Sequence, residues 1–162
     1  MNQQVLEAKQ SVVKEIVEKA GAAQSITIAE YRGLTVAQLQ ELRRALRKED
    51  AELCVYKNYL VERAVKELGY VGVDEVLAGP NAIIFSKELS NGPKIVNKYS
   101  KRFGNVLSVK GGVVEGKFVD AKGMIEVAKM PGREGLISMF LSCLQAPVRQ
   151  FACAVQAVAD AK

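Results

Sequence analysis

The hydrophobic pattern of this 162-residue chain changes repeatedly between the period of a strand and the period of a helix. Ser25–Glu30 alternates apolar and polar residues, as a half-buried strand does, whereas residues 2–20 repeat apolar positions about one or two helical turns apart. Further strands are predicted at 51–56, 82–85 and 105–109, with a hairpin around 115–117, and further helices begin near Thr35, Asn58, Pro93 and Asp120. This alternation predicts an α+β class: a two-layer globular domain with a mixed sheet of about four to five strands packed by helices.

Local signals predict several element boundaries. Thr35, with Gln38 three residues later, predicts a capping box at the start of one helix. Asn58 is predicted to cap the next helix with its side chain. Gly69 and Gly104 are predicted to end the helices before them.

The character of the sequence changes after Gly132. Residues 133–162 contain no strand signal, so we expect a C-terminal helical extension. It is predicted as a helix over 133–144, a break or kink at Ala146–Pro147, and a helix over 147–162. The predicted organisation is therefore a globular domain at 1–132 and a helical tail at 133–162.

The composition argues against several classes of active site. The chain has no histidine, which removes the commonest general base and most zinc sites, and we predict no catalytic, metal or cofactor site. Its three cysteines form no C-x-x-C pair, so we expect reduced thiols in the cytoplasm. We also expect no signal peptide and no membrane partner, because the N-terminus is polar and no run approaches about 18 apolar residues.

One motif is similar to a phosphate-binding loop. Residues 111–117 fit G-x-x-x-x-G-K, but Phe118 stands where the motif needs a Ser or Thr hydroxyl to hold magnesium. Phe118–Val119 also has strand character. A hairpin turn is favoured, and a nucleotide-binding hydrolase is the enzyme alternative.

Basic residues gather around the turns that follow the first two predicted strands. The chain carries 23 Lys and Arg against 18 Asp and Glu, a net charge of +5, which permits a nucleic-acid partner. Arg32 follows one strand and Lys57 the next, and both turns share one sheet edge if these strands run parallel. Gly33 would let an RNA backbone approach closely. The helix between the strands adds Arg43, Arg44, Arg47 and Lys48. The alternative is a basic face that is merely solvated.

An apolar stripe runs along the last part of the tail. Its residues recur at three- and four-residue steps and are Val148, Phe151, Ala152, Val155, Val158 and Ala159. A helix packed back onto the core fits this pattern, and so does a helix that binds a partner's groove. If the helix binds a partner's groove, the chain could be a helical adaptor that does not bind RNA.

Seven short motifs occur in a characteristic order: Glu30–Thr35, Glu41–Arg44, Lys57–Leu60, Leu77–Pro80, Gly111–Gly112 with Glu115–Gly116, Met130–Glu134 and Gln145–Val148. In this order and spacing the chain resembles the bacterial family of large-ribosomal-subunit protein ten over essentially its whole length. It departs from the family pattern at Tyr59 and Asn81, where Thr is usual, and at Gly132, where Ser is usual.

The resemblance implies a structural protein of the ribosome rather than an enzyme. Its globular domain would bind large-subunit rRNA at the stalk base, beside ribosomal protein eleven. Its C-terminal helix would carry dimers of the acidic stalk protein, which recruit translational GTPases, and family members also repress translation of their own message. The region from Gln145 to Lys162, about 27 Å of helix, predicts room for two dimers.

The resemblance also supplies candidate residues. Arg32, Gly33, Arg43, Lys57 and Asn58 fall on family positions and form the candidate RNA-binding set, which Arg47 joins from the same basic helix. The candidate partner-binding set is the apolar stripe of the tail.

Overall fold

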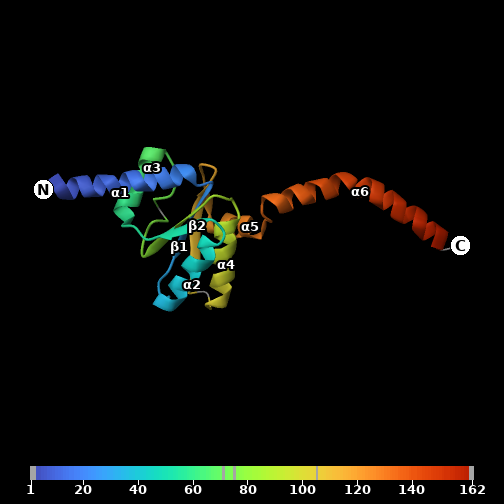
Figure 1. Ribbon diagram of the computed structural model, residues 1–162, viewed down its shortest axis with the longest axis horizontal. Helices are drawn as coiled ribbons and strands as arrows, with labels where there is room; N and C mark the ends of the chain where they lie inside the picture. Colours follow the sequence, from blue (N-terminus) through green and yellow to red (C-terminus); the bar gives the residue numbers. More distant parts are fainter. Residues whose placement is uncertain (1–2, 71, 75, 105, 161–162) are drawn as a thin grey trace. The chain divides into compact units, whose positions relative to one another are not determined.

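The computed structural model describes residues 3–70, 72–74, 76–104 and 106–160. The chain divides into two compact units, Met1–Met130 and Pro131–Lys162. The first unit contains β1 (Ser25–Glu30), β2 (Ala51–Cys54), β3 (Asn81–Ser86), β4 (Ser108–Val114) and β5 (Lys117–Asp120), with α1 (Gln3–Ala22), α2 (Val36–Arg47), α3 (Asn58–Leu68), α4 (Asn91–Arg102) and α5 (Ala121–Lys129) (Figure 1). The second unit contains α6 (Arg133–Asp160). The predicted helix ends at residues 2 and 162 lie outside the described residues.

The five strands form one sheet in the order β2-β3-β1-β4-β5. The α+β class is confirmed, but every neighbouring pair is antiparallel, so the sheet is not mixed as predicted. Because β1 and β2 are both antiparallel to β3, they run in the same direction with β3 between them. The last residues of β1 and β2 therefore lie at the same end of the strands, as the sequence predicted, although the two strands are not neighbours.

Helices cover both faces of the sheet, which gives three layers instead of the predicted two. On one face, Ile83 and Phe85 of β3 pack with α1 and α3, and on the other, Ile84 packs with α2 and α4. All six residues of β3 are buried. A strand that is covered on both faces has an unbroken apolar run in place of alternation, and Ala82–Phe85 is such a run, so the signal for the third layer was present but was not used.

The look-alike phosphate loop is a strand followed by a hairpin. β4 runs from Ser108 to Val114 as one strand, where the sequence suggested a strand over 105–109 and a separate hairpin arm. The turn at Glu115 and Gly116 has positive φ at both residues, 50° and 80°, the geometry of a type I′ hairpin. Lys117 then begins β5, so the helix that a phosphate-binding loop requires is absent here.

Most of the predicted helix boundaries are confirmed, and the N-cap predicted at Asn58 is wrong. Thr35 and Gln38 form the predicted capping box, and Gly69 ends α3 with φ 74°. Asn58 is the first residue of α3, while Lys57 occupies the N-cap position without a side-chain cap. Phe103 is the C-cap of α4, and Gly104 follows it with φ 69°, the left-handed conformation that ends the helix as predicted.

The tail helix is continuous through the predicted break. Pro147 lies inside α6, which Figure 1 shows curving partway along its length. Proline removes one backbone hydrogen bond and crowds the preceding turn, so it bends a helix without necessarily ending it. None of the described residues of α6 is buried.

The start of α4 packs closely against the end of β3. A Cβ atom added at Gly92 would lie 2.2 Å from the Ser86 hydroxyl oxygen, and both residues are buried. That hydroxyl has no hydrogen-bond partner among the described residues. The position therefore favours glycine, because an added methyl group would force the Ser86 hydroxyl out of its place.

We predict that Gly92→Ala lowers the free energy of unfolding by about 1–3 kcal/mol, as overpacking does. Adding Ser86→Ala should restore most of the loss, because it removes the overlapping oxygen. Urea denaturation of the two single variants and the double variant measures this coupling. Equal stability of Gly92→Ala and the parent protein would contradict the packing described.

Candidate RNA-binding and partner-binding surfaces

Four connecting segments meet at the edge where β1 and β2 end and where β3 and β4 begin. Glu30, the last residue of β1, pairs with Asn81 of β3 and with Ser108 of β4. We call the residues 30–34, 56–59, 78–81 and 106–110 the loop edge. It contains four of the six candidate RNA-binding residues: Arg32, Gly33, Lys57 and Asn58.

A β-bulge places Lys110 at the centre of the loop edge. The pairing passes from Ile28 with Gly111 to Ala29 with Val109, which leaves Lys110 as the extra residue. Its Nζ lies 3.0 Å from Glu30 Oε2 and donates a 2.6 Å hydrogen bond to the carbonyl oxygen of Ala78. Lys110 thus joins the end of β1 to the loop before β3.

Asn58 holds the same loop from the other side. Its side-chain amide donates a 2.8 Å hydrogen bond to the carbonyl oxygen of Gly79. Gly79 has φ 88°, and a Cβ there would lie 3.4 Å from Lys110 Nζ. Sequence reasoning assigned Asn58 to the RNA interface, but in this structure its amide nitrogen fixes the loop. Sequence reasoning did not identify Lys110, because a β-bulge cannot be recognised from the apolar–polar pattern of a strand.

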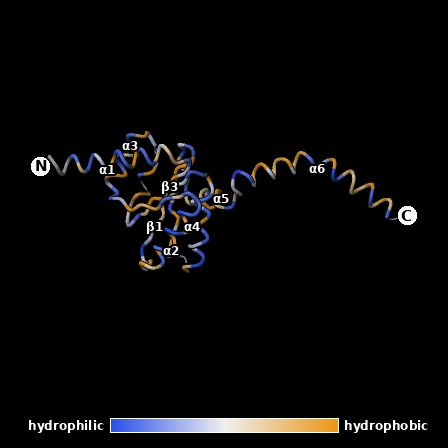
Figure 2. Tube along the Cα trace, viewed as in Figure 1, coloured by the Kyte–Doolittle hydropathy of each residue, from blue (hydrophilic) through white to orange (hydrophobic). Residues whose placement is uncertain are grey.

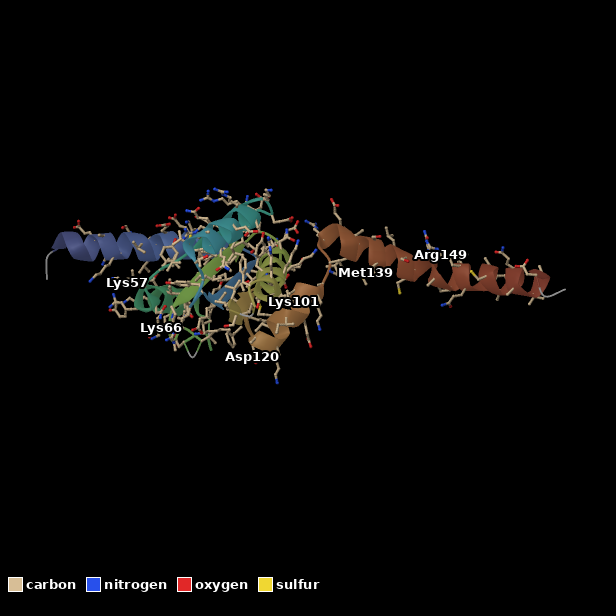
Figure 3. The ribbon with its side chains drawn as sticks, turned by 90° about the horizontal axis from the view of Figure 1, so that it is seen from below. Lys57, Lys66, Lys101, Asp120, Met139 and Arg149 are labelled. Carbon is tan, nitrogen blue, oxygen red and sulfur yellow. The ribbon has the colours of Figure 1, made fainter. Side chains whose placement is uncertain are left out.

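Two cations on the loop edge are free to meet an anion. Arg32 and Lys57 are exposed, and neither has an ion-pair partner among the residues that the structure describes. Gly33 follows Arg32 with φ 92°, and a Cβ there would lie 3.0 Å from Val106 Cγ1. The tight turn, closed by a 3.2 Å hydrogen bond from Leu34 N to Tyr31 O, therefore holds Arg32 at the surface. Figure 3 shows Lys57 at the start of α3.

A stacked pair beside Lys57 is a further feature that sequence reasoning missed. The guanidinium carbon of Arg63 lies 4.3 Å from the centre of the Tyr59 ring, and Arg63 donates to the Tyr59 hydroxyl. The Tyr59 side chain is 54% exposed. The signal was the four-residue spacing, which places the two side chains on one helix face. Aromatic and guanidinium planes of this kind stack on unpaired RNA bases.

The structure separates the two helix arginines from the loop edge. α2 begins beside the loop edge and ends at Arg47, about 18 Å away, near the start of β2 and the end of β3. Arg47 there lines an open hollow of mixed charge with Lys19, Asp50, Glu52 and Lys87. Arg43 is half-buried one turn earlier. The sequence places these arginines on one helix, but it does not show that α2 runs from the loop edge toward the opposite end of the strands.

The candidate partner surface on α6 is open along its length. The side chains of Val148, Phe151, Val155 and Val158 are 73%, 73%, 55% and 65% exposed, and Ala152 and Ala159 are also exposed. Exposed apolar residues extend further toward the start of α6 than the sequence set suggested, and include Leu136, Ile137, Met139, Phe140, Leu141 and Leu144. Figure 2 shows hydrophobic residues recurring along the whole helix, and Figure 3 shows Met139 and Arg149 projecting from it.

The described part of the chain offers neither a metal site of acidic or sulfur ligands nor a membrane-spanning helix. Its residues include no group of three or more His, Cys, Asp or Glu side chains placed to hold a metal ion. No helix within the same residues has the length and apolar character needed to span a membrane.

Comparison with known proteins gives one consistent result. The family described as "Ribosomal protein L10" matches residues 4–103, and the "Ribosomal protein uL10 C-terminal region" matches residues 130–162. The chain is 48% identical over 159 residues to "Large ribosomal subunit protein uL10" of Shouchella clausii (strain KSM-K16), covering 98% of this chain and 95% of that protein. It is 46% identical over 159 residues to the protein of the same name from Bacillus cereus (strain B4264), with the same coverage.

Replacing Lys110 with Met should loosen the loop edge while the sheet stays folded. Methionine keeps an apolar stem but loses the contacts to Glu30 and to the Ala78 carbonyl, and we expect a loss of stability of about 1 kcal/mol. Amide hydrogen exchange should speed up at Val76 and Leu77, whose N–H groups donate hydrogen bonds in the same loop. Lys117→Met, on the neighbouring strand and without an ion-pair partner among the described residues, is the matched control. Unchanged exchange in the loop would contradict the role given to Lys110.

Proposed function

We propose that this chain, which belongs to the ribosomal protein L10 family, binds large-subunit rRNA with its loop edge and carries acidic stalk-protein dimers on α6. It is a protein of the large ribosomal subunit. The proposal places it at the stalk base in the cytoplasm, beside ribosomal protein eleven, where the dimers recruit translational GTPases. The observation that carries the RNA part is that Arg32 and Lys57, exposed on one glycine-containing edge, have no ion-pair partner among the described residues.

The loop edge has the chemistry that an RNA backbone requires. Exposed cations attract phosphates, and releasing the counterions of the RNA adds affinity that depends on salt. Gly33 and Gly79 have positive φ, 92° and 88°, which keeps both turns tight, and at Gly33 we propose that the RNA backbone approaches closely. Lys110 and Asn58 hold the loop in place, which limits the entropy lost on binding. Tyr59, stacked with Arg63, offers a plane for an unpaired base.

The candidate RNA residues have different roles in this proposal. Arg32 and Lys57 contact phosphates, Gly33 permits the approach, and Asn58 supports the neighbouring loop. Arg43, half-buried partway along α2, lies outside the loop edge and in this proposal attracts the RNA backbone at longer range. Arg47 lies at the opposite end of the sheet and is not part of the loop-edge contact.

An enzymatic function has weak support. The G-x-x-x-x-G-K sequence forms strand and hairpin rather than a loop opening a helix, and Phe118 has no hydroxyl. The family to which the chain belongs is one of structural ribosomal proteins. We therefore propose a scaffold and not a catalyst.

α6 has the features of a helix that binds partners along its side. Its apolar side chains are exposed on a continuous helix, so the stripe is not interrupted at Pro147. Covering such a stripe with a partner groove removes apolar surface from water, which contributes about 25 cal/mol per Å². Arg149 is the basic residue within the stripe region and would steer an acidic partner. We propose that two dimers bind between Gln145 and Lys162. We also propose that the protein represses translation of its own message.

Arg32→Ala with Lys57→Ala should weaken binding to a stalk-base rRNA fragment without changing the melting temperature. Each lost charge-assisted contact is expected to cost about 1.5–3 kcal/mol. The plot of log Kd against log salt should also become shallower. The matched control is Arg47→Ala with Lys87→Ala, which removes the same charge at the other end of the sheet. If both double variants lose equal affinity, the loop edge is not the specific surface.

Phe151→Asp should remove the partner dimer centred on that residue, because it places an unpaired charge in an apolar contact. Native mass spectrometry of the chain mixed with acidic stalk protein gives the count. We expect four partner chains for the parent protein and two for the variant. Gln150→Asp, which adds the same charge on another side of α6, should keep all four. Six chains on the parent would contradict the two-dimer proposal, and none would remove the partner surface.

A further inference from the structure

α4 and α5 form a shallow groove whose charged residues are separate from those of the loop edge. The groove is lined by Lys94, Asn97, Lys98, Lys101 and Arg102 from α4 and by Ala128 and Lys129 from α5. Five of these seven residues carry a positive charge and none is acidic. We call this surface the basic groove; Lys101, one of its residues, is labelled in Figure 3.

The lysines of α4 lie on one side of the helix. Lys94, Lys98 and Lys101 follow each other by four and three residues, so their ammonium groups are stacked about one turn apart. All three are exposed, whereas Val96 on another side of α4 is fully buried in the core. The row therefore follows the groove and faces solvent.

Acidic neighbours do not neutralise this row. In α1 and α3, lysines pair with a glutamate four residues earlier: Lys19 with Glu15 and Lys66 with Glu62. α4 contains no acidic residue at all. Among the described residues, Arg102 is the member of the groove that has an ion-pair partner, Glu41 of α2. Stacking like charges destabilises a helix, so this arrangement costs stability that a bound anion would restore.

The chemistry of the groove fits a phosphate backbone better than an apolar protein surface. Lysine ammonium groups are compact point charges that bind phosphate oxygens without reading bases. A protein partner would need a buried apolar or aromatic anchor, and Ala128 is the single apolar residue in the lining. Arg102 also lies over the Tyr99 ring, 5.7 Å from its centre, which fixes a cation at one end of the row.

We propose that the basic groove binds the sugar-phosphate backbone of a second rRNA segment, independently of the loop edge. This inference rests on the proposed rRNA-binding function and extends it to another layer of the fold. Two phosphate contacts on different elements would fix the orientation of the globular unit on RNA, which a single edge cannot do. The contact would be independent of base sequence.

The test measures binding of the full-length chain to a stalk-base rRNA fragment over a range of salt concentrations. The groove variant combines Lys94→Gln, Lys98→Gln and Lys101→Gln. The control variant combines Lys9→Gln, Lys14→Gln and Lys117→Gln, which removes three exposed lysines without ion-pair partners in the described part of the chain. Both variants have the same net charge, so a difference between them reports position rather than overall charge.

We expect the groove variant to bind at least about tenfold more weakly than the control at moderate salt. Each lost phosphate contact should reduce the steepness of log Kd against log salt by about 0.7–0.9. Combining the groove variant with Arg32→Ala and Lys57→Ala should add the two losses in log Kd, because the sites share no side chain. Melting temperature checks the fold, and Lys98→Gln with Lys129→Gln replaces the triple variant if that one is unstable.

The outcomes separate this inference from the proposed function. If the groove and control variants bind RNA equally, while the loop-edge variant is weak, the inference is wrong and the proposed function stands. If the parent chain binds no RNA, both are wrong. If the groove variant keeps its RNA affinity and instead loses the acidic stalk protein, the groove is a protein contact and the inference is wrong.

Discussion

The ion pair and hydrogen bond made by Lys110 hold together the surface on which our account of RNA binding depends. The bulge in β4 turns this one lysine out of the regular ladder, so that it reaches both Glu30 at the end of β1 and the carbonyl of Ala78 before β3. β1 and β2 both end at this edge because β3 lies between them and runs in the opposite direction. Because the Lys110 contacts fix the loop, Arg32 and Lys57 are presented beside an ordered segment, although neither residue makes those contacts.

Local sequence signals predicted local structure well. The strand Ser25–Glu30, the capping box at Thr35, the end of α3 at Gly69 and the hairpin at Glu115–Gly116 depend on neighbouring residues alone, and the structure confirms each of them. The strand is not half-buried as its alternation predicted, however, because Ser25 and Thr27 on its polar side are buried too. The sheet order, the third layer and the bulge depend on contacts between distant segments. A hydrophobic period describes which face a residue prefers, but not which strand will lie beside it. For the same reason the sequence placed Arg47 with Arg32, although α2 carries it to the other end of the sheet.

The two units differ in whether their apolar side chains are buried or exposed. In the unit Met1–Met130 the apolar residues fill two cores, one on each face of the sheet, whereas in α6 they are exposed. The matches to the two family descriptions, over residues 4–103 and 130–162, follow the same division. In our proposal the first unit contributes charge for RNA and the second contributes apolar surface for protein. Each surface then depends on a different force, so salt should weaken the first far more than the second.

The most direct test of this division is amide hydrogen exchange of the full chain alone, with a stalk-base rRNA fragment, and with acidic stalk protein. The account predicts that RNA slows exchange at the loop edge, in residues 31–34 and 78–81, and leaves α6 unchanged. Stalk protein should slow exchange in α6 between residues 145 and 160 and leave the loop edge unchanged. Protection of α6 by RNA, or an unprotected loop edge in the RNA complex, would contradict it.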